Sequence, residues 1–273
     1  MIPICNKENL IQLAIDNKEK YQNAIPFPYI ELENFFNDEF LNQVLDEFPD
    51  LSNIKDSLHY SGATDEKFTT PRGDSFLMDN TKKFLSFLNS SLFINFLQEI
   101  TSIKEPLIPD PHFIGGGLHQ SKRGGFLKVH TDYAKHPETN LDRRLNVLIY
   151  LNKDWKEEYN GHLSLYDKDM KICHQKILPS FNKIVIFNTT DFSFHGVPDP
   201  ILCPESDFRK SIAIYYFSNG RPFSELRSVL QNPSTIYKER PGEIFNKNLN
   251  KKDLIKLFIP PILLNILFRF LKR

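Results

Sequence analysis

The sequence is poor in cysteine and has no excess of charge of either sign. Cys5, Cys173 and Cys203 are far apart, and no C-x-x-C pair occurs. A disulfide scaffold and a structural zinc site are therefore not predicted, and a reducing, cytoplasmic setting is expected. Basic and acidic residues number 34 each, so no electrostatic argument favours nucleic acid as a partner.

Long apolar runs are also scarce at the two ends of the sequence. The first twenty residues lack a basic start followed by an apolar stretch, so no secretory signal is expected. Residues 257–268 carry no charge, but this run is shorter than the roughly 18–20 residues that cross a bilayer as a helix. We expect a terminal helix packed on the body or on a second subunit. Weak membrane association through 256–273, as an interfacial helix, is the alternative.

Glycine forms no phosphate-binding motif. The segment 114–125, IGGGLHQSKRGG, lacks G-K-[ST] at the required spacing. We interpret its glycines as turn or bulge residues at the rim of a barrel. No Ser-His-Asp or Cys-His arrangement stands in a suitable context either.

Aromatic residues are abundant, with 24 Phe and 10 Tyr, and their spacing divides the chain. The N-terminal part has helical spacing, and from about residue 106 the apolar period changes to 2. The expected N-terminal elements are a polar helix within 1–25, a strand in 27–36, a helix starting at Asn37 or Asp38, an irregular polar stretch at 50–75 and a second helix over 80–101. The expected strands are 126–130, 144–151, 162–167, 174–178, 183–187, 192–197 and 209–217.

This order predicts a mainly β fold with α-helices: a double-stranded β-helix, or jelly roll, braced by N-terminal helices. We expect a helix and strand lead-in at 1–105, a jelly-roll core at 106–225 and a C-terminal extension at 226–273 with an apolar, basic-ended helix.

His130 and Asp132 are the first candidate metal ligands. They stand at i and i+2 at the end of an apolar strand, so their side chains point to the same face. Two histidines and one carboxylate on one face are typical of non-haem Fe(II) oxygenases. A second H-x-[DE] pattern, His136-Pro137-Glu138, lies in a polar run whose proline suits a loop.

The second histidine must come from a later strand, and His195, His162 and His174 are the choices. His195 is favoured because it ends an aromatic strand and because Arg209 follows on the next one. A guanidinium matches a carboxylate in geometry, as the far carboxylate of a dicarboxylic co-substrate would require.

These motifs together resemble the prolyl-hydroxylase-like branch of the 2-oxoglutarate/Fe(II) oxygenases. The resemblance covers about residues 110–220 strongly, and residues 25–49 look like the lead-in of bacterial members. It rests on HTD, RRLNVLIYLNKDW, YNGHLSLYD, FSFHGVPDP and FRKSIAIYYF, in this order.

The resemblance implies a dioxygenase that hydroxylates an unactivated C–H bond with Fe(II), 2-oxoglutarate and O2. His130, Asp132 and His195 would bind the iron, and no further catalytic side chain is expected. The distal carboxylate of 2-oxoglutarate would be bound by Arg209 and Tyr150, with help from Ser211. Because the histidines must be neutral to bind metal, activity should fall at acidic pH.

The sequence departs from the family pattern at two places. Many relatives have a tyrosine three residues before the H-x-D histidine, near the keto-acid end of the co-substrate, where this chain has Leu127. Asn146, His119 and Gln120 are candidate replacements. An insertion at 200–207 lengthens the interval from the last histidine to the arginine.

Several interpretations stay open. Arg143 and Arg144 are expected in a solvated loop rather than facing an acidic substrate, and Trp155 is expected to be a packing residue. A cupin-like metal enzyme that does not use 2-oxoglutarate is the second enzyme hypothesis. A non-catalytic jelly-roll binding or membrane-peripheral module is the third. The substrate could be a prolyl residue of a peptide or a small molecule.

Overall fold

The computed structural model describes residues 3–5, 9–222, 225 and 235–243. Most of the expected C-terminal extension, including the apolar run at 257–268 and the segment 256–273, lies outside the described residues. Within them, no helix combines the length and apolarity needed to cross a membrane.

Among the described residues, four α-helices lie in the N-terminal part, and strands dominate the rest. The helices are α1 (Leu10–Gln22), α2 (Asp38–Asp46), α3 (Asp79–Leu88) and α4 (Ser91–Thr101). The strands are β1 (Tyr29–Glu33), β2 (Leu58–Ser61), β3 (Asp65–Thr69), β4 (Ile108–Pro109), β5 (Gly117–Ser121), β6 (Phe126–Thr131), β7 (Asp142–Tyr150), β8 (Leu163–Tyr166), β9 (Cys173–Ile177), β10 (Lys183–Asn188), β11 (His195–Val197), β12 (Arg209–Ser218) and β13 (Ile236–Tyr237).

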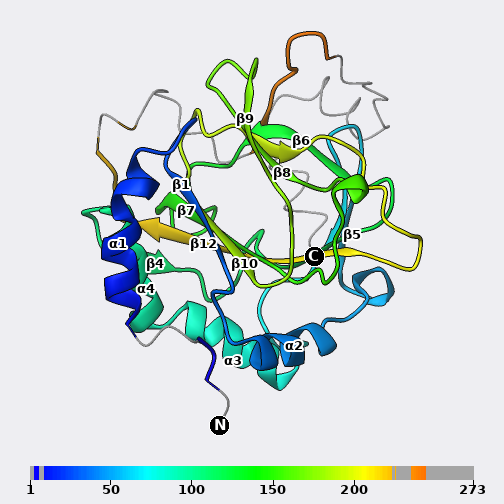
Figure 1. The fold of residues 1–273 in the computed structure, drawn as a ribbon, viewed down its shortest axis with the longest axis horizontal. Coiled ribbons are helices and arrows are strands. Elements are labelled where there is room, and N and C mark those ends of the chain that lie inside the picture. The colour runs from blue at the N-terminus through cyan, green and yellow to red at the C-terminus, as the bar shows by residue number, and fades with distance from the viewer. Residues whose placement is uncertain (1–2, 6–8, 223–224, 226–234, 244–273) are drawn as a thin grey trace, which may run out of the picture.

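The strands form one curled antiparallel sheet. The order across it is β1-β10-β7-β12-β5-β3-β6-β11-β8-β9, with β2, β4 and β13 attached to β3, β12 and β6. Figure 1 shows the strands curling round to face one another, with the helices on one side. The predicted jelly roll with a mainly β content is confirmed. The predicted domain boundaries at 105/106 and 225/226 stay a prediction, although β1 and β3 pair with strands of the core.

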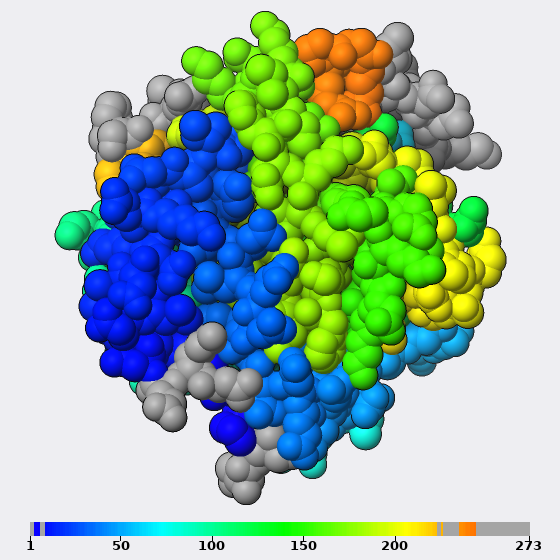
Figure 2. Space-filling model, viewed as in Figure 1, coloured from blue at the N-terminus to red at the C-terminus, as the bar shows by residue number. Residues whose placement is uncertain are grey.

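The alternation of side chains along β7 explains which face is left for a site. Val147 and Ile149 join the cluster that packs against the helices, whereas Tyr150 belongs to a second cluster on the inner face. The helices cover the outer face through aromatic contacts. The ring centroids of Phe35 and Phe96, for example, lie 5.3 Å apart. Figure 2 shows the blue N-terminal residues lying directly against the green strand residues. The inner face is therefore enclosed by the sheet itself.

The N-terminal half differs from the expectation in three places. The helix expected over 80–101 is two helices, because the Ser90 side chain caps the start of α4 at the Phe93 amide. The stretch expected to be irregular at 50–75 contains the hairpin β2–β3. The segment 114–125, whose glycines were expected in turns or bulges, contains strand β5. These strands are short and rich in polar residues, so they give no clear apolar period.

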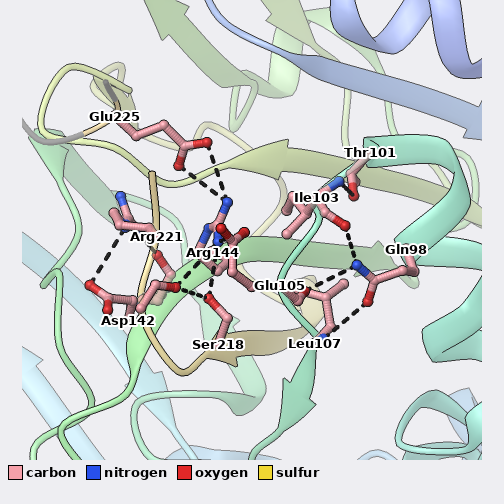
Figure 3. Close-up of polar contacts among 12 residues, drawn as sticks. Gln98, Thr101, Ile103, Glu105, Leu107, Asp142, Arg144, Ser218, Arg221 and Glu225 are labelled. Carbon is pink, nitrogen blue, oxygen red and sulfur yellow. Dashed lines mark hydrogen bonds and ion pairs between the residues drawn. The ribbon is translucent and has the colours of Figure 1, made fainter. Parts of the chain in front are cut away.

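The expectation of a solvated loop at Arg143 and Arg144 is wrong. Both lie in β7 and are 1% and 3% exposed. Figure 3 shows Arg144 in a polar network with Glu105, Ser218 and Glu225, at 2.7, 3.0 and 3.3 Å. Two buried cations can occupy a strand because carboxylates and hydroxyls come from other elements to pair with them, which local sequence does not reveal.

Candidate metal centre

His130, Asp132 and His195 converge on one point inside the curled sheet. His130 in β6 and His195 in β11 are direct partners in the antiparallel ladder. Their ligand atoms and one carboxylate oxygen of Asp132 all lie within 4.8 Å of one another, an arrangement that could hold a metal ion. The choice of His195 over His162 and His174 agrees with this geometry.

Backbone contacts fix the orientation of both imidazole rings. The Nδ1 atom of His130 lies 2.8 Å from the carbonyl oxygen of Lys128, and that of His195 lies 2.9 Å from the carbonyl oxygen of Ser193. A carbonyl can only accept a hydrogen bond, so each Nδ1 carries the proton. Each Nε2 therefore presents its lone pair toward Asp132, which is the arrangement that a metal requires.

The Asp132 carboxylate is held by two further residues of β7. Asn146 donates its side-chain amide to Oδ2 at 2.7 Å, and Arg143 Nη2 lies 3.4 Å from Oδ1. Burial alone would raise the pKa of Asp132, but the charge of Arg143 beside it outweighs this effect, and the pKa lies well below its usual range. The carboxylate is thus ionised, as metal binding requires.

Arg143 is itself fixed between two aromatic rings. Its guanidinium lies 4.4 Å from the ring centroid of Tyr133 and 3.5 Å from that of Tyr215. It also donates to Asn146 Oδ1 from Nε and Nη2. This cluster was not predicted from the sequence, where Arg143 stands among polar residues.

Arg209 lines the same cavity, whose volume is about 420 Å³, and Tyr150 lies beside Arg209. Arg209 Nε donates to the Gly161 carbonyl at 2.6 Å, and its guanidinium carbon lies 5.0 Å from the centre of the Tyr150 ring. Burial lowers the pKa of Arg209, and no carboxylate of the described residues pairs with it. The buried Tyr150 hydroxyl likewise has no hydrogen-bond partner within the described ranges. A cation and a hydroxyl are therefore left for an anion.

Glycine at position 161 makes room for this arrangement. A Cβ atom there would lie 3.1 Å from Arg209 Cδ, and its φ of +78° favours glycine. Ser211 faces the same cavity, in register with both Tyr150 and His119. The three predicted co-substrate residues therefore come together.

The three candidate replacements for the missing tyrosine have different surroundings in the structure. His119 lines the cavity together with Leu127, and its Nε2 atom is buried without a partner in the described part of the chain. Asn146 is already bound to Asp132. The interpretation of Gln120 is wrong, because its amide faces the other side of β5 and bonds Leu51 N and Asp50.

The contacts of His136 indicate a structural role. Its Nε2 lies 3.5 Å from Asp110, and its Nδ1 accepts from the backbone amides of Glu138 and Thr139. The ring packs edge-on against Phe217. The second H-x-[DE] pattern thus closes a turn. Trp155 is a packing residue as expected: it is buried and packs edge-on against Tyr159.

Three cavity residues come from segments in which the sequence analysis placed no functional residue. Lys67 and Tyr60 belong to the β2–β3 hairpin, and Tyr237 belongs to β13. Tyr237 pairs with His130 across the ladder, with ring centroids 5.2 Å apart. For Lys67, the signal available in the sequence was the two-residue spacing of Asp65, Lys67 and Thr69, which places these side chains on one face of a short strand.

His119 gives a stability prediction for the metal-free protein. Burial, reinforced by the charge of Lys67, lowers its pKa to about 3, against about 6.5 in the unfolded chain. Below pH 6.5 the unfolded chain binds a proton that the folded chain cannot bind. This contribution to stability is therefore complete above pH 6.5 and is lost on acidification, by about 1.4 kcal/mol per pH unit.

Urea unfolding at pH 7, 6 and 5 measures this dependence. His119→Gln should make stability fall less steeply with acid, whereas His174→Gln, at an exposed position, should leave the slope unchanged. Equal slopes for His119→Gln and the unaltered chain would contradict the assignment.

Residues 116–217 match the family model described as the 2OG-Fe(II) oxygenase superfamily. Prolyl 3-hydroxylase OGFOD1 of Mus musculus is 31% identical over 86 residues, which are 30% of this chain and 15% of that protein. The chain thus spans a small part of the length of this curated relative. The matched segment contains the three clustered ligands together with Tyr150, Arg209 and Ser211.

Two solved structures share the fold. The first is a prolyl hydroxylase of Trichoplax adhaerens in complex with a peptide fragment of the hypoxia inducible factor oxygen degradation domain. It has a TM-score of 0.57 and 17% identity, and covers 77% of this chain and 90% of that one. The second is a Pseudomonas putida prolyl-4-hydroxylase, with a TM-score of 0.51, 14% identity and coverage of 77% and 100%.

Proposed function

We propose that this chain, whose residues 116–217 carry the core of the 2OG-Fe(II) oxygenase superfamily, is an Fe(II)- and 2-oxoglutarate-dependent dioxygenase that hydroxylates an unactivated C–H bond. One observation carries the proposal. The cavity lined by the clustered His130, Asp132 and His195 is also lined by the buried Arg209, which pairs with no carboxylate of the described residues, and Tyr150 lies beside Arg209.

The roles follow from the donors that each residue offers. The neutral Nε2 atoms of the two histidines and the ionised Asp132 would hold Fe(II) on one face and leave the opposite positions open. Arg209 and Tyr150 would bind the distal carboxylate of 2-oxoglutarate, and Ser211 would add a hydroxyl. Iron with 2-oxoglutarate and O2 supplies the oxidising chemistry, in which the co-substrate becomes succinate and CO2 as the C–H bond becomes C–OH.

The chain's own residues prepare this site. Asn146 and Arg143 keep Asp132 ionised and fixed in direction. The carbonyls of Lys128 and Ser193 fix the tautomers of the two histidines. A site oriented in this way needs little rearrangement when its ligands bind.

A prolyl residue of a peptide is the substrate class that we put first. The proposal is supported by the similarity to a curated prolyl 3-hydroxylase and by the fold shared with a prolyl hydroxylase that is complexed with a peptide. A small molecule is the second class. We propose a cytoplasmic location because the cysteines are few and those described form no disulfide with one another.

Anaerobic titration of the metal-free protein with Fe(II) and 2-oxoglutarate tests the function. We expect the visible metal-to-ligand charge-transfer band that the chelated keto acid gives with Fe(II), and we expect His130→Ala to abolish it. Arg209→Met should require roughly 10- to 100-fold more 2-oxoglutarate for the same band. Iron binding without a band would favour a cupin-like metal enzyme, and no iron binding would reject both enzymes.

Tyr150→Phe should separate stability from co-substrate binding. The Tyr150 hydroxyl is buried beside Arg209, so its removal should change the stability of the free protein by no more than about 1 kcal/mol. The same change should weaken 2-oxoglutarate binding by about fivefold, because one hydrogen bond to the carboxylate is lost. Urea unfolding and the band titration measure the two effects. A Tyr150→Phe protein that binds 2-oxoglutarate as tightly as the unaltered chain would remove Tyr150 from the site.

A further inference from the structure

The inference concerns the end of the cavity where the chain departs from its relatives. 2-Oxoglutarate carries two carboxylates, and Arg209 with Tyr150 accounts for one of them. The other belongs to the keto-acid end beside the metal. Leu127, at the position where many relatives have a tyrosine, lines the cavity, and its side chain cannot donate a hydrogen bond. A different donor must compensate the second negative charge.

Strand β3 places a lysine next to this position. Strand β3 lies between β5 and β6: its Thr69 pairs with His119 of β5, and its Asp65 pairs with Leu127 of β6. Lys67 stands midway between Thr69 and Asp65, and residues at i and i+2 of a strand share a face. Lys67 therefore faces the cavity between His119 and Leu127, and it lines that cavity together with both.

The Lys67 ammonium has little compensation from the protein. In the described part of the chain, its nearest carboxylate is Asp65 at 4.0 Å, which is beyond hydrogen-bond distance, and its other contact is the ring of Tyr60 at 5.1 Å. Burial lowers the pKa of Lys67, and the charges of Asp132, Arg143 and Arg209 also act on it. The lysine thus lines the cavity within electrostatic range of both the metal ligand Asp132 and Arg209. His119 beside it presents a second buried nitrogen without a partner in the described residues.

We propose that Lys67, with His119 next to it, binds the keto-acid carboxylate of 2-oxoglutarate and so replaces the donor that Leu127 lacks. This assignment rests on the proposed function. It makes Lys67 a residue that distinguishes 2-oxoglutarate from dicarboxylates without a keto-acid group, such as succinate. Succinate is one carbon shorter than 2-oxoglutarate. When one of its carboxylates occupies the distal site, the other takes the place of the keto group, so no carboxylate reaches the position that Lys67 binds.

The test compares these two dianions. The protein is loaded with Mn(II) in place of Fe(II), and calorimetry measures its affinity for 2-oxoglutarate and for succinate. Lys67→Met should weaken 2-oxoglutarate binding roughly 10- to 100-fold and leave succinate binding nearly unchanged. Arg209→Met should weaken both. An equal loss for both ligands in Lys67→Met would show only a long-range charge effect and would overturn the proposal.

Two controls make the result specific. Lys210→Met removes a lysine that contacts Phe48 and is not among the residues lining the cavity, and it should change neither affinity. Mn(II) affinity should be unchanged in Lys67→Met, which shows that the fold and the metal centre persist. Leu127→Tyr added to Lys67→Met should recover part of the 2-oxoglutarate affinity.

The outcomes also separate this proposal from the function itself. If the unaltered chain binds 2-oxoglutarate and Lys67→Met does so equally well, the oxygenase assignment stands and the role of Lys67 is wrong. Lys67 would then face the substrate that becomes hydroxylated. If the unaltered chain binds no 2-oxoglutarate in the presence of metal, both proposals fall together.

Discussion

His195→Ala should abolish the Fe(II) and 2-oxoglutarate charge-transfer band and weaken metal binding beyond the roughly 10- to 100-fold loss that replacing an outer partner costs. The reason is geometric. His195 and His130 are ladder partners whose Nε2 atoms face one carboxylate, at 3.5 and 3.7 Å. Two ligands from the remaining pair cannot complete a facial site for iron.

Equilibrium dialysis of Fe(II) under anaerobic conditions measures this loss. His174→Ala provides the matched control, since His174 was a competing choice in the sequence and is exposed in strand β9. We expect it to bind iron as the unaltered chain does. If His195→Ala retained one tightly bound iron while His174→Ala or His162→Ala lost it, the metal centre would have been assigned to the wrong histidine.

The metal ligands could be predicted because their signals are local or follow strand order. His130 and Asp132 stand two residues apart on a strand, and two-residue alternation alone brings them to one face. His195 required the assumption that a later strand crosses back to the first, which the pairing of β11 with β6 confirms. Arg209 and Tyr150 were found through resemblance, and the structure brings Arg209 to the cavity that holds the ligands and places Tyr150 beside Arg209.

The residues that were missed owe their place to tertiary pairing. Lys67 faces the cavity because β3 inserts between β5 and β6, and a polar five-residue strand gives no apolar period to reveal it. Gln120 was misread because a one-residue shift along β5 moves a side chain to the opposite face. The buried Arg143 was read as solvated because its partners, Tyr215 and Asp132, come from other strands and loops.

Arg143→Met should be the most destabilising single change near the site, by about 3–5 kcal/mol in the metal-free protein. Arg143 is 1% exposed, and it lies beside the Asp132 carboxylate and between two tyrosine rings. Methionine fills much of the volume but leaves Asp132 without its compensating cation. Either the carboxylate stays charged at high cost or it takes up a proton, and both lower the free energy of unfolding.

A bound divalent metal replaces that missing positive charge, which gives the prediction a second and more specific part. Adding Mn(II) should raise the melting temperature of Arg143→Met by more than it raises that of the unaltered chain. Arg72→Met serves as the control, because Arg72 is 61% exposed in its pair with Glu138. We expect it to change stability by less than about 0.5 kcal/mol. If metal stabilised Arg143→Met no more than it stabilised the control, the charge of Asp132 would not depend on Arg143. Arg143 would then act only through packing.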